Sequence, residues 1–168
     1  MKKYITTALL LTTLIFTACA QHRKTVKKHS KPGKVSALNI SSVAMSRGAC
    51  FGRCPIYTVT INSNGLVQYK GKGFTEHMGV YEKKFTPQQV ATVLQDFKDN
   101  RVDTCAANYE QLIADVPGIY YKIIINGKEK NIGNAHFGPA FLKQLAQDVD
   151  AFGQVDNSWK KISSDVPE

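Results

Sequence analysis

Two Asn-Gly dipeptides constrain the fold of this chain more than any other feature, because each stands between two short runs rich in β-branched and aromatic residues. The dipeptides are Asn64-Gly65 and Asn126-Gly127. Both residue types tolerate the positive φ of a tight two-residue turn, so this arrangement is a strong β-hairpin signal. The sequence therefore predicts two antiparallel hairpins. Their strands are Ile56–Ile61, Leu66–Tyr69, Ile119–Ile125 and Lys128–Ile132.

A helix signal follows each hairpin. Val80–Phe85 is typical of a third strand after the first hairpin, and Thr86 then supplies an N-cap residue. Pro87 suits the first helical position, and Gln89 completes a capping box. Gly138-Pro139 marks the start of the second helix. Each helix has one apolar stripe at helical spacing. The stripes are Val90, Val93, Leu94 and Phe97, and Leu142, Leu145, Val149 and Phe152.

The order strand-strand-(strand)-helix thus occurs twice, which is compatible with an old duplication. We expect an α+β fold: an antiparallel sheet built from two hairpin-containing β-β-(β)-α units, with two helices packed on one face. This is the simplest arrangement that buries both stripes. Residues 35–168 are enough for one domain with a core and too few for two. Leu38–Met45 adds a candidate strand, and the strand order is left open.

The first residues are typical of a bacterial lipoprotein signal peptide. Lys2 and Lys3 are followed by an uncharged stretch, Ile5–Phe16, which is too short to span about 30 Å of hydrocarbon as a helix. Thr17-Ala18 then precedes Cys19, as in the lipobox at which a thiol is alkylated by a diacylglycerol group. We expect residues 1–18 to be removed and Cys19 to carry lipid that anchors the protein in a membrane. The alternative is an ordinary signal peptide cut close to the same position.

Charge is distributed unevenly along the chain. Residues 19–34 contain six Lys or Arg and no acidic residue, and they are expected to form a basic, flexible linker, either as a mere spacer or resting on anionic headgroups. Residues 35–168 hold 14 basic and 13 acidic residues, so the formal charge of +9 is not a property of the domain. This balance argues against a nucleic-acid surface. The absence of an acidic run after Cys19 resembles sorting signals that favour the periplasmic face of the outer membrane.

Three further cysteines are expected to lie in an oxidising compartment. Three residues separate Cys50 from Cys54, and Cys105 is distant. One interpretation is a structural Cys50–Cys54 disulfide with Cys105 as a buried thiol. A second is a redox pair, since Arg47 and Arg53 would stabilise a thiolate, although such pairs usually have two intervening residues and stand at a helix start. A zinc site would need two distant histidines as further ligands. Pairing of Cys105 with one of the two, or three reduced thiols, also stays open.

The stretch Cys50-Phe51-Gly52-x-Cys54-Pro55-x-Tyr57, with the first hairpin and Tyr69-x-Gly71 after it, resembles an uncharacterised bacterial family, domain of unknown function 6438. The likeness continues through Tyr109, Asp115-x-Pro117, the second hairpin and Gly138-Pro139, and runs from about Leu38 to about Trp159. The resemblance implies a lipoprotein or secreted protein, and no activity or catalytic residue. Cys105 lies outside the family pattern, which favours Cys50 pairing with Cys54.

The remaining polar residues give a candidate functional loop region of Arg47, Arg53, Asp115 and His136. Asp115, before Pro117, is expected to fix a turn by accepting backbone N–H groups, and His136 to act as a loop or capping residue. Five tyrosines suggest either an aromatic binding face or half-buried strand packing. They are Tyr57, Tyr69, Tyr81, Tyr120 and Tyr121.

No catalytic triad, phosphate loop, metal-ligand pattern or cofactor motif stands out in the sequence. We therefore predict a non-enzymatic cell-envelope lipoprotein whose domain binds a protein or cell-wall partner. The alternative function is that of a thiol-disulfide redox protein acting through Cys50 and Cys54. An enzyme with residues gathered from separate loops, such as Arg53, Asp115 and His136, would need a deep pocket that joins them.

Overall fold

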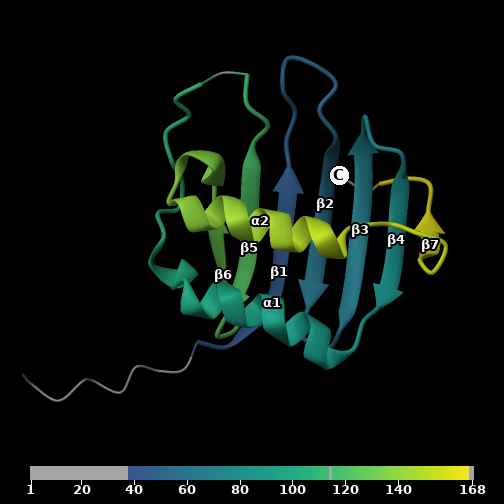
Figure 1. The fold of residues 1–168 in the computed structure, drawn as a ribbon, viewed down its shortest axis with the longest axis horizontal. Helices are drawn as coiled ribbons and strands as arrows, with labels where there is room; N and C mark the ends of the chain where they lie inside the picture. The colour runs from purple at the N-terminus through teal and green to yellow at the C-terminus, as the bar shows by residue number, and fades with distance from the viewer. Residues whose placement is uncertain (1–37, 114, 167–168) are drawn as a thin grey trace, which may run out of the picture. The chain divides into compact units, whose positions relative to one another are not determined.

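The computed structural model describes residues 38–113 and 115–166, which form a mixed structure of one sheet and two helices (Figure 1). Within these residues the strands form one seven-stranded sheet in the order β6-β5-β1-β2-β3-β4-β7, and all neighbouring strands are antiparallel. The strands are β1 (Ile40–Arg47), β2 (Ile56–Asn62), β3 (Leu66–Gly73), β4 (Gly79–Lys84), β5 (Ile119–Ile125), β6 (Lys128–Ile132) and β7 (Lys160–Ser163). The expected signal peptide, Cys19 and the basic linker lie outside the described residues.

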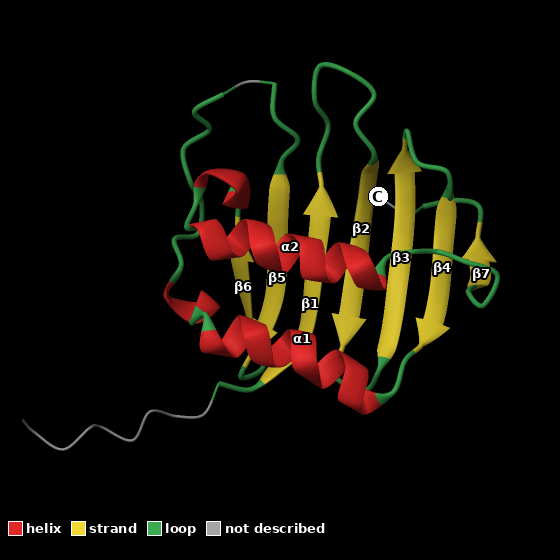
Figure 2. Ribbon diagram, in the orientation of Figure 1, coloured by secondary structure: helices red, strands yellow, loops and turns green. Residues whose placement is uncertain are grey.

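Helices α1 (Pro87–Asp99) and α2 (Ala140–Phe152) cover the same face of this sheet (Figure 2). Two short 3₁₀ turns, η1 (Val102–Thr104) and η2 (Ala135–Phe137), precede β5 and α2 respectively. The predicted α+β fold, an antiparallel sheet with two helices on one face, is confirmed. In the part of the chain that the structure describes, neither helix has the length and apolar character needed to cross a membrane.

Helix α1 begins as its sequence predicts. The side chain of Thr86 accepts a hydrogen bond from the backbone N–H of Gln89, and the N–H of Thr86 donates to the side-chain oxygen of Gln89. This reciprocal capping box satisfies N–H groups that have no partner within the helix. The apolar stripe of α1 is buried, and so is that of α2 except for a half-buried Phe152.

The core lies between the helices and one face of the central strands. Alternate side chains of β1, β2 and β5 are almost completely buried there, including Val43, Val59 and Ile123. The other face of the sheet carries small and polar side chains, such as Ser46 and Thr58, whose hydroxyl groups are hydrogen-bonded to each other. The period of two along each strand thus separates an apolar face from a polar one.

Two strand predictions need correction, and one further strand was not predicted. The candidate strand at Leu38–Met45 is β1, but it begins at Ile40, continues to Arg47 and occupies the middle of the sheet between β2 and β5. Strand β3 runs on to Gly73, because its pairing with β4 continues to Gly71 and its pairing with β2 continues to Gly73. The edge strand β7 was not predicted, because its Lys-rich residues are mostly exposed and show no alternation of burial.

The five tyrosines do not share one face. Tyr69 and Tyr121 are buried in the core, and Tyr57 and Tyr81 pack against it from the helix-covered face. Tyr120 is 43% exposed, and as the neighbour of Tyr121 along β5 it points to the opposite face. Packing on the sheet is therefore confirmed for four of the five, of which two are half-buried and two are buried, and an aromatic face made of all five is wrong.

Candidate functional site

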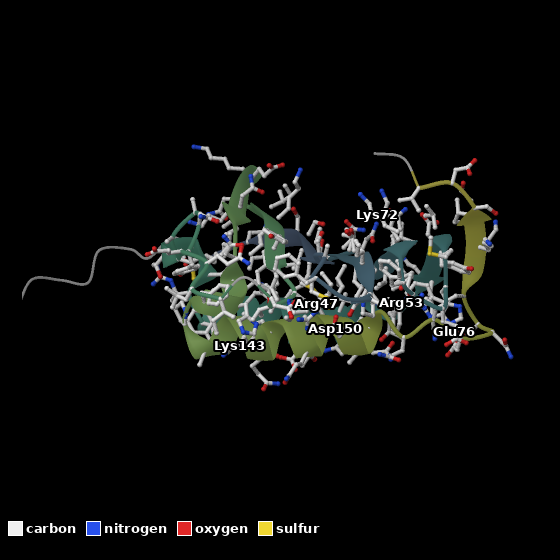
Figure 3. The ribbon with its side chains drawn as sticks, turned by 90° about the horizontal axis from the view of Figure 1, so that it is seen from above. Arg47, Arg53, Lys72, Glu76, Lys143 and Asp150 are labelled. Carbon is white, nitrogen blue, oxygen red and sulfur yellow. A yellow bond between two sulfur atoms is a disulfide. The ribbon has the colours of Figure 1, made fainter. Side chains whose placement is uncertain are left out.

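The central strands bring an arginine and a tyrosine to the same place. Arg47, the last residue of β1, lies directly opposite Tyr57 of β2 in the antiparallel register. Both side chains reach Asp150 of α2, which crosses this part of the sheet. In Figure 3 Arg47 and Asp150 meet between the sheet and α2, and Lys143 and Glu76 lie to either side of them.

The carboxylate of Asp150 joins these three side chains into one network. Its Oδ2 accepts a hydrogen bond from Nη2 of Arg47, and its Oδ1 accepts one from the Tyr57 hydroxyl at 2.6 Å. The Arg47 and Asp150 side chains are 21% and 22% exposed, so solvent screens the ion pair only partly. We call Arg47, Asp150 and Tyr57 the network.

Burial and hydrogen bonding hold the protonation states of the network. Burial and the hydrogen bond to Asp150 raise the pKa of Tyr57 well above its ordinary value, so its phenol stays neutral. Burial alone lowers the pKa of Arg47. The hydrogen bond and the negative charge of Asp150 act in the opposite direction and outweigh burial, so the pKa is raised overall. At neutral pH the network thus holds one cation, one anion and one neutral hydroxyl.

The loop between Arg47 and Tyr57 is closed by a disulfide. Cys50 is bonded to Cys54, with their Cα atoms 5.8 Å apart, and Cys105 is a free, buried thiol. The backbone N–H of Phe51 donates to Oδ1 of Asp115 at 3.0 Å. Asp115 therefore does accept a backbone N–H group, but from the cysteine loop rather than from its own turn. The bridge and this bond hold the loop that connects β1 to β2.

Next to the network lies a polar cavity of about 230 Å³. Its wall includes Tyr57 and Asp150 of the network, Tyr69 and Thr75, whose hydroxyl groups are 2.5 Å apart, and Gln154. Glu76, His77 and Val155 also line it, and the same three residues line a neighbouring cavity of about 580 Å³ together with Tyr81, Asp156 and Trp159. We call the two adjoining cavities the groove.

Two glycines permit the close approaches that shape the groove. A Cβ on Gly71 of β3 would lie 1.9 Å from the carbonyl oxygen of His77, so the loop over residues 74–78 can fold this close only above a glycine. A Cβ on Gly153 would lie 2.5 Å from Cγ2 of Val59, so the end of α2 also needs a glycine to approach β2. These two close approaches place the 74–78 loop on one side of the groove and the end of α2 on the other.

The four predicted loop residues do not form one site. Arg47 belongs to the network, and Asp115 holds the cysteine loop. Arg53 is exposed and makes no hydrogen bond or ion pair with the described residues. His136 is half-buried in η2, where burial, and then the charges of Lys143 and Arg47, lower its pKa. Arg53, Asp115 and His136 are not part of the groove wall.

The zinc hypothesis finds no ligand set in the described residues. Within 38–113 and 115–166, no three His, Cys, Asp or Glu side chains are close enough together to hold a metal ion. Both cysteines of the proposed pair are bonded to each other.

Sequence reasoning missed Asp150 and the 74–78 loop. A signal for Asp150 exists, because it stands one turn after the buried Ala146 and next to the buried Val149, on the side of α2 that faces the sheet. An acidic residue in that position needs a partner from the sheet. The 74–78 loop carries no comparable pattern, and its role depends on a close approach to Gly71 that only the folded chain reveals.

Comparison with known families identifies the domain. A family model described as a domain of unknown function, DUF6438, matches residues 41–153, which is more than half of the chain, and the chain belongs to that family. The match includes the cysteine loop, all three residues of the network and the 74–78 loop. The searches of curated proteins and of solved structures each found no significant match.

Proposed function

We propose that this member of an uncharacterised family is a lipid-anchored protein of the bacterial cell envelope, and that its domain is a binding or interaction module rather than an enzyme. Lipid on Cys19 would hold the domain at a membrane through the basic linker, on the periplasmic face of the outer membrane. The observation that carries the binding role is the groove beside the network, a preformed polar cavity with aromatic walls.

The chemistry of the network supports binding over catalysis. A general base takes a proton from its substrate, whereas each carboxylate oxygen of Asp150 already accepts one hydrogen bond, from Arg47 or from Tyr57, and has only its remaining lone pair for a further donor. A nucleophilic or acidic tyrosine needs a lowered pKa, and that of Tyr57 is raised. These groups fix the shape and charge of one end of the groove.

The ends of the sheet also suit a tethered binding module. Strand β1 starts at one end, and the loops over residues 48–55, 74–78 and, on either side of an undescribed position, 105–113 and 115–118 reach the other end (Figure 1). These loops carry large apolar side chains in solvent, with Phe51 83% and Leu112 73% exposed. Apolar side chains exposed together are a common feature of interaction surfaces. A partner would therefore meet the end of the domain that is remote from the start of β1.

The redox alternative has one observation in its favour, the Cys50–Cys54 bridge itself. A strand, β2, follows this bridge instead of a helix, so no helix N-terminus would stabilise a thiolate there. We therefore assign the bridge a structural role, which is to hold the loop next to Arg47 and Tyr57.

Site-specific photo-crosslinking in intact cells tests the binding role. Gln154, which lines the groove, and Gln95, on the exposed side of α1, are matched positions, because each exposed side chain bonds only to a residue four positions away on its own segment. We expect a photoreactive residue in place of Gln154 to give a defined adduct and one in place of Gln95 to give none. Equal labelling from both positions, or none from either, contradicts the proposal.

A further inference from the structure

A further cavity, of about 320 Å³, lies against strands β1, β5 and β6. Its wall includes Ser46 from β1, Tyr120 and Lys122 from β5, and Asn131 from β6. In the register of the sheet Ser46 lies opposite Tyr120, and Lys122 lies opposite Asn131. Because side chains alternate along a strand, these four side chains point to the face that the helices leave uncovered (Figure 2). We call this cavity the sheet pocket.

Tyr120 supplies the sheet pocket with an aromatic ring that rests on backbone and is open to solvent. A Cβ on Gly118 would lie 2.3 Å from Cε2 of this ring, and a Cβ on Gly48 would lie 3.0 Å from the same atom. The N–H of Gly48 donates to the carbonyl oxygen of Gly118 at 2.9 Å, so the two glycines form one continuous support. Tyr120 is nevertheless 43% exposed, and its hydroxyl group makes no hydrogen bond within the described residues. The ring is therefore held in place without being buried, as a contact surface for a ligand requires.

The polar groups beside this ring carry no uncompensated charge. Nζ of Lys122 lies 3.4 Å from Oε2 of Glu129, and Oε1 of Glu129 accepts a hydrogen bond from Nδ2 of Asn131 at 2.9 Å. Within the described residues this is the one side-chain bond of Asn131, so its second N–H and its side-chain oxygen are available. The hydroxyl group of Ser46, 2.8 Å from that of Thr58, keeps further acceptor capacity. The sheet pocket thus offers both donors and acceptors to an uncharged ligand.

From this combination we infer that the sheet pocket binds a pyranose sugar unit of an uncharged glycan, which stacks on Tyr120 and bonds Asn131 and Lys122 through its polar groups. A pyranose has an apolar face of C–H groups, which is attracted to the negative face of an aromatic ring, and a rim of hydroxyl groups. One open ring with uncharged donors and acceptors beside it matches both parts of such a ligand. The inference rests on the proposed binding function and adds the chemical class of a partner, at a site on the opposite face of the sheet from the groove.

An NMR titration of the isotope-labelled full-length protein tests this site. The probes are triacetylchitotriose and cellotriose, which share pyranose rings and differ in their acetamido groups, and the open-chain polyol sorbitol is the matched compound without a ring. We expect saturable shifts of the amide signals of Tyr120, Lys122 and Asn131 with a trisaccharide, and none with sorbitol. Amides of the 74–78 loop, which belongs to the groove, should not shift. A response to triacetylchitotriose alone assigns the acetamido sugars of a cell-wall glycan as the ligand, and equal responses to both trisaccharides assign the pyranose ring.

Two aromatic variants separate a sugar contact from a general loss of exposed rings. Tyr120→Leu keeps an apolar side chain above Gly118 and removes the ring, and it should weaken trisaccharide binding about fivefold. Phe74→Leu removes a ring that is 59% exposed and lies outside the sheet pocket, and it should leave binding unchanged. Because Tyr120 is itself partly exposed, its substitution should not unfold the domain, and the amide spectrum without ligand checks this.

Several outcomes would overturn the inference. They are no saturable shift with either trisaccharide, equal responses to trisaccharide and sorbitol, shifts confined to residues outside the sheet pocket, or equal affinities of the two aromatic variants. If both trisaccharides fail while photo-crosslinking from Gln154 succeeds, the glycan site is wrong and the binding function stands. If the trisaccharides and the crosslinking all fail, the binding function itself is wrong.

Discussion

The network makes a quantitative prediction about stability. Asp150→Ala removes the acceptor of two hydrogen bonds and leaves Arg47 and the Tyr57 hydroxyl without partners. Exposed ion pairs contribute at most about 1 kcal/mol, whereas breaking a buried pair costs about 3–5 kcal/mol. With both side chains near one-fifth exposed, we expect a loss of about 3 kcal/mol in the free energy of unfolding. For a domain of this size that corresponds to a fall in Tm of roughly 9 °C.

A double-mutant cycle separates the pair from its surroundings. Arg47→Met, Asp150→Ala and the double variant are compared with the original protein by urea unfolding, followed through the fluorescence of Trp159. We expect the two residues to be coupled by about 2 kcal/mol, in the range measured for side chains in direct contact. Tyr57→Phe deletes one hydrogen bond and should cost only about 1 kcal/mol. A coupling energy below about 0.5 kcal/mol would refute the argument that partial burial makes this ion pair strong.

Three further predictions concern the bridge and two titrating groups. Replacing both Cys50 and Cys54 by serine should lower the free energy of unfolding in urea by about 2 kcal/mol and leave the fold intact. A bridge that is reduced and reoxidised at the potential of cellular thiols without loss of stability would instead favour a redox function. Because the pKa of Tyr57 is raised in the folded protein above about 10 in the unfolded chain, its contribution to stability is complete below pH 10 and is lost as pH rises toward the folded pKa. The drop in unfolding free energy from pH 9 to pH 11 should therefore be smaller in Tyr57→Phe, and an equal drop would speak against this. Because the pKa of His136 is lowered in the folded protein, its contribution to stability is present above about pH 6.5 and is lost on acidification. An NMR titration should place the pKa of His136 below 6.5, and Lys143→Gln should raise that pKa. An unchanged pKa in Lys143→Gln would show that the charge of Lys143 does not act on His136.

Local sequence signals predicted most of the fold because they act within a few residues. The capping box at Thr86, the apolar stripes and both hairpins depend on near neighbours, and all appear in the structure. Asn126-Gly127 forms the expected two-residue turn with positive φ at both residues, but the first hairpin turns through three residues, Ser63-Asn64-Gly65, and only Gly65 has a positive φ there. Strand order depends instead on pairing between distant segments. The position of β1 between β2 and β5 could not be read from Leu38–Met45 alone.

The candidate site was predictable only in part, for the same reason. Arg47 is recognisable as a candidate residue because it stands close to the cysteines in the sequence, but its partner Asp150 is 103 positions away. The cysteine pairing followed from short spacing together with the family resemblance. The groove needs the end of α2, the 74–78 loop and the segment before β7 at once, and no local pattern combines these three.

The proposed function depends first on where the domain is held. The mass of the N-terminal tryptic peptide of the native protein, extracted from cell membranes, tests this most directly. The proposal predicts that the peptide begins at Cys19 and carries the mass of a diacylglyceryl group on that cysteine, and that Cys19→Ala releases the protein from the membrane fraction. A native protein that begins at Met1, or that has an unmodified Cys19, would contradict the envelope anchor on which the proposed location depends.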